Sequence, residues 1–91
     1  MAFFPAGINP IKYHSDSSSV TVASGGYETK TFDISSLGAT RILSVAYSDT
    51  QGGAICGDIR EISTTAIKIG FYNSYNSSLT ATITINVLYE K

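Results

Sequence analysis

The sequence is poor in the residues that build covalent or metal-bound sites. Its 91 residues include one cysteine (Cys56), one histidine (His14) and no tryptophan. A single cysteine excludes a disulfide within the chain and a cysteine-based zinc cluster. His14 has no second ligand at metal-binding spacing and no nucleophile motif beside it. We therefore expect no cofactor and no metal.

Charged residues are also scarce. They make up 14% of the chain, with 6 Lys and Arg against 7 Asp and Glu. This balance leaves no basic stripe to neutralise phosphates, so nucleic acid and anionic membranes are poor candidate partners. No stretch approaches the roughly 20 apolar residues of a membrane span, and the N-terminus lacks the features of a secretory signal. We expect a protein made in the cytoplasm, without membrane insertion.

The acidic residues do not suggest a catalytic pair. Those on which a glycosidase could draw are Asp49, Asp58, Glu61 and Glu90. Asp58 and Glu61 flank Arg60, so surface ion pairing explains them more simply than acid–base catalysis. We expect the protein not to be an enzyme.

The short chain and its apolar content predict one domain. Hydrophobic residues make up 43% of the sequence, which is enough for one core but not for two. Domains of this size often gain stability by oligomerisation. We therefore expect self-association.

The first 18 residues differ from the rest, because their apolar residues follow neither a period of 2 nor one of 3.6 and two prolines interrupt them. We expect an extended N-terminal arm over residues 1–18, with a polar hinge at Ser15–Ser19, and a β-sandwich domain over residues 19–91. The apolar content of the arm argues against a solvated tail, so the arm packs either along its own domain or against a neighbouring subunit. The arm residues expected to take part in assembly are Phe3, Phe4, Ile8 and Ile11.

From residue 19 onward, polar and apolar residues alternate and β-branched residues are concentrated, as is typical of strands. The expected strands cover residues 19–23, 27–33, 41–47, 54–62, 66–73 and 79–89. The Gly25-Gly26 pair is expected to join the first two in a hairpin, and Asp33 to cap backbone amides at the corner that follows. The alternation places Leu43 and Val45 on one face of their strand. Ile62 falls out of phase, which suggests a bulge or a strand end.

The segment that ends the chain alternates most clearly. Its apolar residues, which we expect to face the core, are Leu79, Ala81, Ile83, Ile85, Val87 and Tyr89. Its outward residues are Thr80, Thr82, Thr84 and Asn86. Only a half-buried antiparallel strand explains this pattern well, and we expect it to be central. The sequence therefore predicts an all-β fold, an antiparallel β-sandwich of about six strands.

One segment has the composition of a binding site. Residues 72–77 mix tyrosine, asparagine and serine, which offers rigid rings beside adaptable hydrogen-bonding groups. Sugars suit such a surface, although the same residues are also ordinary turn residues. The candidate ligand contacts are Tyr72, Asn73, Tyr75 and Asn76.

Three segments of the chain carry a resemblance to a known family. They are Thr31–Gly38 (TFDISSLG), Ile67–Asn73 (IKIGFYN) and Ile83–Lys91 (ITINVLYEK). The stretch from residue 27 to residue 91 resembles the carboxy-terminal β-sandwich domains of tailed-bacteriophage tail-fibre proteins, which are similar to H-type lectin sandwiches. The resemblance implies a lectin-like, six-stranded sandwich at the tip of a trimeric appendage that binds a host-surface glycan.

On this basis we expect a non-enzymatic structural protein of a bacteriophage virion, of the host-recognition or adhesion type. The homotrimer is expected to form through Thr80, Thr82 and Thr84, because hydroxyls pair across an interface at little desolvation cost. Other virion proteins are further expected partners. The alternative is a capsid decoration, cement or fibre-anchoring protein that is attached through its N-terminal arm.

Overall fold

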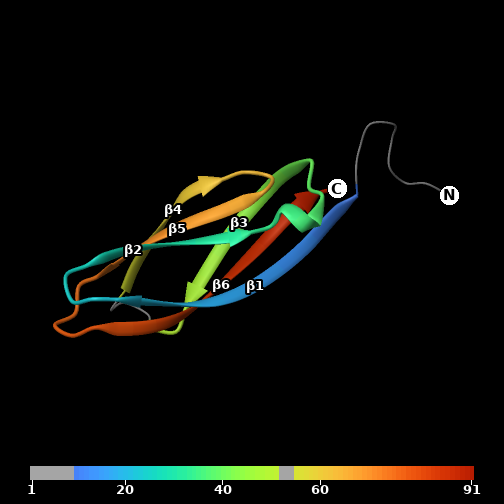
Figure 1. Cartoon of the computed structure of the whole chain (residues 1–91). Coiled ribbons are helices and arrows are strands. Elements are labelled where there is room, and N and C mark those ends of the chain that lie inside the picture. The colour runs from blue at the N-terminus through green and yellow to red at the C-terminus, as the bar shows by residue number, and fades with distance from the viewer. Residues whose placement is uncertain (1–9, 52–54) are drawn as a thin grey trace.

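The computed structural model describes residues 10–51 and 55–91, and these form a sandwich of two antiparallel sheets (Figure 1). The strands are β1 (Ile11–Val22), β2 (Tyr27–Asp33), β3 (Arg41–Asp49), β4 (Ile55–Ile62), β5 (Ala66–Asn73) and β6 (Leu79–Glu90), with a 3-10 turn η1 at Ser35–Leu37. One sheet has the order β1-β6-β3 and the other β2-β5-β4. The predicted antiparallel all-β sandwich is confirmed.

The core lies between the two central strands, β5 and β6. Period-two alternation turns every second side chain of each strand toward the other sheet. The buried hydrophobic side chains from these two strands are Ile67, Ile69, Phe71, Ala81, Ile83, Ile85, Val87 and Tyr89. The inward set predicted for the last strand is confirmed, except that Leu79 is only partly buried. The central position predicted for this strand is also confirmed, because β6 pairs with β1 on one side and β3 on the other.

The strand β1 begins much earlier than the sequence predicts. It pairs with β6 from Ile11 opposite Glu90 to Val22 opposite Leu79, so the polar hinge predicted at Ser15–Ser19 is wrong and the domain boundary predicted after residue 18 falls inside a strand. The alternation misleads here because its phases are reversed: the inward phase carries Lys12, His14 and Asp16, whereas Ile11 and Tyr13 are exposed on the outward face. Polar inward residues are tolerated here because β1 is an edge strand.

The Gly25-Gly26 turn joins two sheets, so the predicted hairpin is wrong. The amide of Gly26 donates to the carbonyl of Ala23 (2.8 Å), and Gly25 adopts a positive φ of 68°. Backbone bonds between the turn and Asn73 connect it to the end of β5, with Gly25 N to Asn73 O at 3.0 Å. The chain therefore leaves one sheet and enters the other, and β2 pairs with β5.

Two bulges shift the alternation at the outer strands. In β3 the register shifts between Ile42 and Ser44, which leaves Leu43 as the extra residue and 39% exposed. Leu43 and Val45 therefore do not share a face, contrary to the sequence prediction. In β4 the register shifts between Ile59 and Glu61 and the strand ends at Ile62, so both features that the phase of Ile62 suggested, a bulge and a strand end, are present.

The corner after β2 is held as the sequence predicts. The Asp33 carboxylate accepts hydrogen bonds from the Ser35 hydroxyl (2.6 Å) and the Ser35 amide (2.9 Å). Ile34 is buried beneath this turn, and Gly38 ends it with a φ of 66°. The corner thereby carries the chain back across to β3 in the other sheet.

Candidate functional site

The outer face of β1-β6-β3 consists mainly of small uncharged polar side chains. Residues directly opposite each other in an antiparallel pair share a face, and the register sets Thr21 opposite Thr80 and Ser17 opposite Thr84. We call this surface the hydroxyl face, and its residues are Ser15, Ser17, Ser19, Thr21, Ser44, Ser48, Thr80, Thr82, Thr84 and Asn86. Among the described residues of this sheet face, charge is confined to the Arg41–Glu90 ion pair at one end.

Hydrogen bonds within the chain order the hydroxyl face. Ser17 and Thr84 pair through their hydroxyls at 2.9 Å, and Thr21 and Thr80 do so at 2.8 Å. Thr82 is held through its backbone, whose amide donates to a hydroxyl in the loop after β3. These cross-strand pairs restrain the side chains of the hydroxyl face.

One end of the same face is apolar. The exposed residues there are Ile11 (60%), Tyr13 (63%), Leu43 (39%) and Leu88 (42%). They lie where β1 begins and β6 ends, and the Tyr13 hydroxyl donates to Asn86 Oδ1 at 2.6 Å. The structure thus brings Ile11 onto the same face as Thr80, Thr82 and Thr84, which are the other assembly candidates from the sequence. The remaining assembly candidates, Phe3, Phe4 and Ile8, lie outside the described residues.

Asn73 is a structural residue, and its prediction as a ligand contact is wrong. It is fully buried, and its side-chain amide donates to the carbonyls of Val22 and Ser77, each at 2.9 Å. Its Oδ1 accepts the amide of Tyr75 at 2.8 Å. The signal in the sequence is its phase, because Asn73 continues the inward series of β5 while its side chain closes the loop that follows.

The other predicted contacts are exposed but divide between two places. Tyr72 (46% exposed) stands on the outer face of β5, whereas Tyr75 (55% exposed) and Asn76 belong to the loop between β5 and β6. The loop is tied to the β1–β2 turn by the Ser24 hydroxyl, which donates to the Tyr75 carbonyl at 2.7 Å. The predicted site is thus split between a sheet face and a loop.

The outer face of β2-β5-β4 assembles a different group around Tyr72. The register places Tyr27 of β2 directly opposite Tyr72 of β5, and Tyr27 is 47% exposed. The guanidinium carbon of Arg60 lies 5.6 Å from the centroid of the Tyr27 ring, a distance typical of a cation–π contact. Arg60 also forms an ion pair with Asp58 at 3.0 Å, as its position in the sequence led us to expect. We call Tyr27, Tyr72, Asp58 and Arg60 the tyrosine platform.

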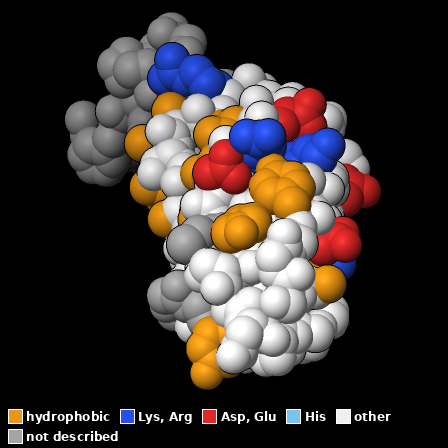
Figure 2. All heavy atoms as spheres, turned by 90° about the vertical axis from the view of Figure 1, so that its left-hand side faces the viewer, with side chains coloured by type: hydrophobic (Ala, Val, Ile, Leu, Met, Phe, Trp, Pro, Cys, Tyr) orange, Lys and Arg blue, Asp and Glu red, His pale blue; other side chains and the backbone are white. Residues whose placement is uncertain are grey.

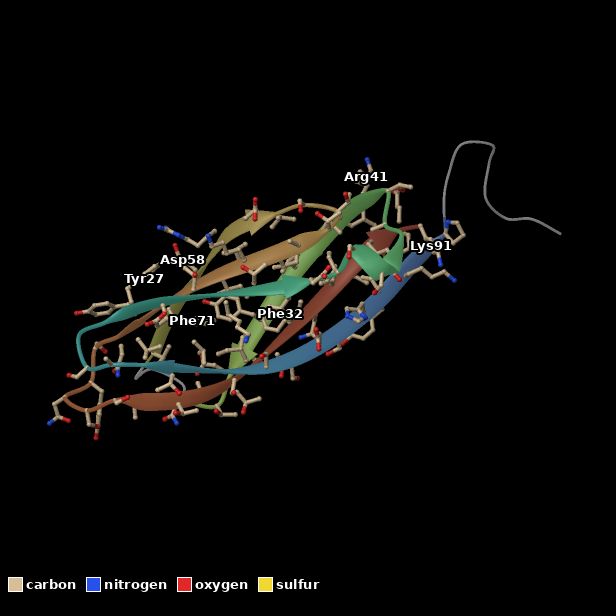
Figure 3. The ribbon with its side chains drawn as sticks, in the orientation of Figure 1. Tyr27, Phe32, Arg41, Asp58, Phe71 and Lys91 are labelled. Carbon is tan, nitrogen blue, oxygen red and sulfur yellow. The ribbon has the colours of Figure 1, made fainter. Side chains whose placement is uncertain are left out.

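A glycine makes room for the platform. The Tyr27 ring leans over Gly70, where a Cβ atom would overlap the Tyr27 hydroxyl and lie 2.6 Å from its Cζ atom. Figure 3 shows Tyr27 and Asp58 on the outer side of their sheet, while Phe32 and Phe71 lie between the sheets. Figure 2 shows the molecule from the left-hand side of Figure 1. In its upper half, hydrophobic side chains lie among acidic and basic ones, and the lower half is largely uncharged. The alternation in the sequence does not reveal that Tyr27 lies beside Tyr72, because it does not show which strands pair.

No pocket is found within residues 10–51 and 55–91, and no three His, Cys, Asp or Glu side chains in this part of the chain are grouped to hold a metal ion. The described residues contain no helix long and apolar enough to cross a bilayer.

Comparison of the chain with models of protein families, with curated proteins and with solved structures finds no match. The functional proposals therefore rest on the two outer faces.

Proposed function

We propose that this chain is a non-enzymatic structural protein of a bacteriophage virion, a tail-fibre-like adhesion domain that forms a homotrimer. The observation that supports this most is the hydroxyl face, a sheet surface on which the described residues carry charge only in one ion pair at its end. An exposed sheet face normally carries several charged residues that keep it soluble. A face of serine and threonine is instead suited to being covered by a like surface.

Burial of the hydroxyl face against other copies costs little. Hydroxyls both donate and accept, so serine and threonine find partners across an interface without the matching that carboxylates or ammonium groups require. The exposed apolar residues at its end, Ile11, Tyr13, Leu43 and Leu88, add the transfer of apolar area from water. A closed ring of three copies buries this face in every protomer. Phe3, Phe4 and Ile8 are proposed as further contacts in the assembly.

Such an assembly leaves the opposite face of each sandwich free. The outer face of β2-β5-β4 carries the exposed Tyr27 and Tyr72, residues that offer contact area at a low entropy cost. One side of the domain thus serves assembly with itself and with other virion proteins, and the other side faces the host surface.

Binding to bacterial cells tests this function. Fluorescently labelled protein is expected to bind intact cells of strains that the encoding phage infects, to compete with phage adsorption, and to be detected in purified virions by mass spectrometry. Binding to purified capsids or tail tubes but to no cells would support a decoration, cement or fibre-anchoring protein instead. Absence of the chain from purified virions would contradict a virion protein of either kind.

A further inference from the structure

Four large apolar side chains are exposed together at one end of the hydroxyl face. We call Ile11, Tyr13, Leu43 and Leu88 the apolar patch. The register sets Tyr13 of β1 opposite Leu88 of β6, and Leu88 opposite Ser44 of β3, which follows the bulge residue Leu43. Single apolar residues on a surface are ordinary, but a group drawn from three adjacent strands is typical of a contact site.

Residues 1–9 join the fold at the border of the apolar patch. Pro10 directly precedes Ile11, and its carbonyl accepts the amide of Lys91 at 3.1 Å, so the start of β1 and the end of β6 lie together (Figure 1). The sequence of residues 1–9, MAFFPAGIN, has no charged side chain. Its large apolar residues are Phe3, Phe4 and Ile8. A segment of this composition gains free energy when it is buried against an apolar surface.

We infer that residues 1–9 of each copy cover the apolar patch of a neighbouring copy in the proposed trimer. Phe3 and Phe4 are the anchors, because aromatic side chains bury the most apolar area. Their expected contacts are Tyr13 and Leu88. Each copy gives one segment and receives one, and the exchange closes in a ring of three. This inference rests on the proposed homotrimer and names the segment and the surface that hold it together.

The length of the segment suits this exchange. The apolar patch crosses three strands, and neighbouring strands lie about 4.8 Å apart, so the patch is about 10 Å wide. The chain from Phe4 to Pro10 reaches at most about 20 Å when it is extended. That reach is enough to cross from one copy to the patch of another copy whose hydroxyl face lies against it.

The direction of β1 favours a neighbouring copy over the same chain. The hydrogen bond from Lys91 to the Pro10 carbonyl continues the β1–β6 ladder past the end of β6, so the chain at Pro10 follows the strand axis away from the patch. A segment that covered its own Tyr13 would have to reverse direction, and a proline disfavours compact backbone at the residue before it. A segment that crosses to a neighbour needs no reversal.

A separate globular partner fits the apolar patch less well. Stable interfaces bury about 800 Å² on each partner, whereas the patch consists of four side chains, two of which are less than half exposed. The charge beside the patch is already matched, because Glu90, opposite Ile11, forms an ion pair with Arg41. A short uncharged segment therefore suits the patch in both size and charge.

Disulfide cross-linking tests where the segment lies. Phe4→Cys is combined with Leu88→Cys in a chain that also carries Cys56→Ala, so that only the introduced thiols pair. After oxidation, non-reducing gel electrophoresis is expected to show disulfide-linked trimers, because each bond joins one copy to the next. Phe4→Cys with Thr31→Cys is the matched control, since Thr31 is exposed on the outer face of the other sheet. This pair is expected to form no linked trimer.

Sedimentation equilibrium measures what the contact contributes to assembly. Phe4→Ser and Leu88→Ser are each expected to raise the dissociation constant of the trimer at least tenfold. The double variant is expected to lie within about threefold of the weaker single variant, because both substitutions remove the same contact. Tyr75→Ser is the control, since Tyr75 is as exposed as the patch residues but belongs to the β5–β6 loop, and it should leave the constant unchanged. Circular dichroism verifies that every variant is folded.

Three results would overturn the inference while the trimer stands. Loss of free thiols without a linked trimer would place residues 1–9 on the patch of their own chain. Linked trimers as abundant with Thr31→Cys as with Leu88→Cys would place the segment elsewhere, and additive losses in the double variant would show that Phe4 and Leu88 do not touch. A wild-type protein that is monomeric would instead remove the proposed trimer together with this inference.

Discussion

The two outer faces of this sandwich differ in chemistry although they cover the same core. The hydroxyl face of β1-β6-β3 is uncharged along most of its length and ordered by serine and threonine pairs such as Ser17–Thr84. The outer face of β2-β5-β4 exposes two tyrosines beside the Asp58–Arg60 ion pair. In our proposal the hydroxyl face meets other copies of the chain, and the outer face of β2-β5-β4 meets the host surface.

This difference shows how little the core constrains the outside of a sandwich. In each strand only every second residue is required to be apolar, and the alternate residues are free to vary as long as they suit a strand. Both sheets use the same inward chemistry, with isoleucine at Ile69 in one and Ile85 in the other. Their outward positions differ, with hydroxyl side chains on one face and tyrosines beside an ion pair on the other.

The largest expected effect separates the core from either outer face. Ile85→Ala should lower the free energy of unfolding by about 2–4 kcal/mol, because it removes buried methyl groups and leaves a cavity in the central strand. Thr84→Ala, the next residue on the hydroxyl face, removes one hydroxyl pair and should cost about 1 kcal/mol or less. Urea denaturation of both variants at one protein concentration measures this. Equal losses would contradict the assignment of inward and outward residues in β6.

The second prediction tests which face assembles. Wild-type protein should have a mass of about three times the 9.7 kDa chain by light scattering coupled to size-exclusion chromatography. Thr82→Lys should dissociate it, because like charges would meet around the threefold axis. Thr29→Lys, on the outer face of the other sheet, should leave the mass unchanged. A wild-type mass of one chain would rule out a stable trimer, and a trimer that tolerates Thr82→Lys would place the interface on another face.

The third prediction compares two glycines that each lie beneath a tyrosine ring. A Cβ atom on Gly57 would lie 2.7 Å from the hydroxyl of Tyr47, whose ring packs edge-on against the buried Phe71. Gly57→Ala should therefore cost about 1–3 kcal/mol through overpacking. Gly70→Ala should cost less than about 1 kcal/mol, because the Tyr27 ring swings into solvent and the substitution removes the entropic cost of glycine in a strand. Denaturation curves that show equal losses would mean that Tyr27 is as constrained as Tyr47.

The smallest expected effect concerns Asp33, at the end of the outward row of β2. Hydrogen bonds from the Ser35 hydroxyl, and then from the Ser35 amide, lower the pKa of Asp33 below its ordinary value of 3.8. A lowered pKa in the folded state stabilises the fold above the unfolded-state pKa, and this contribution is lost as the pH falls through the folded-state value. Acid conditions below about pH 4 should therefore weaken the corner after β2.

Titration of the Asp33 carboxyl carbon by NMR measures this shift. Ser35→Ala should raise the pKa of Asp33 toward its ordinary value, because it removes the donor that contributes most. Ser36→Ala, one position further along the same turn, is the control and should leave it unchanged. A pKa that does not respond to Ser35→Ala would show that the hydroxyl bond is absent in solution.

The sequence predictions succeeded where the apolar residues of a strand face the core and failed where the inward residues are polar. The alternation of β5 and β6 predicted their buried residues, including Ile67 and Ile85. The first half of β1 shows no such alternation, because its inward phase holds residues such as His14 and Asp16 at a sheet edge. The burial of Asn73 was missed because an asparagine near a turn is expected to be exposed.

By itself, the sequence determined that the chain is an all-β sandwich, which residues of the central strands form its core and where Asp33 caps a corner. Only the tertiary structure decided which strands pair, that the Gly25-Gly26 turn crosses between sheets, and that Tyr27 stands beside Tyr72. The physical reason is that a period of two specifies the face on which a side chain lies but not the strand beside it. Strand partners are set by how the whole apolar surface is buried at once, so surfaces composed from several strands emerge only in the folded chain.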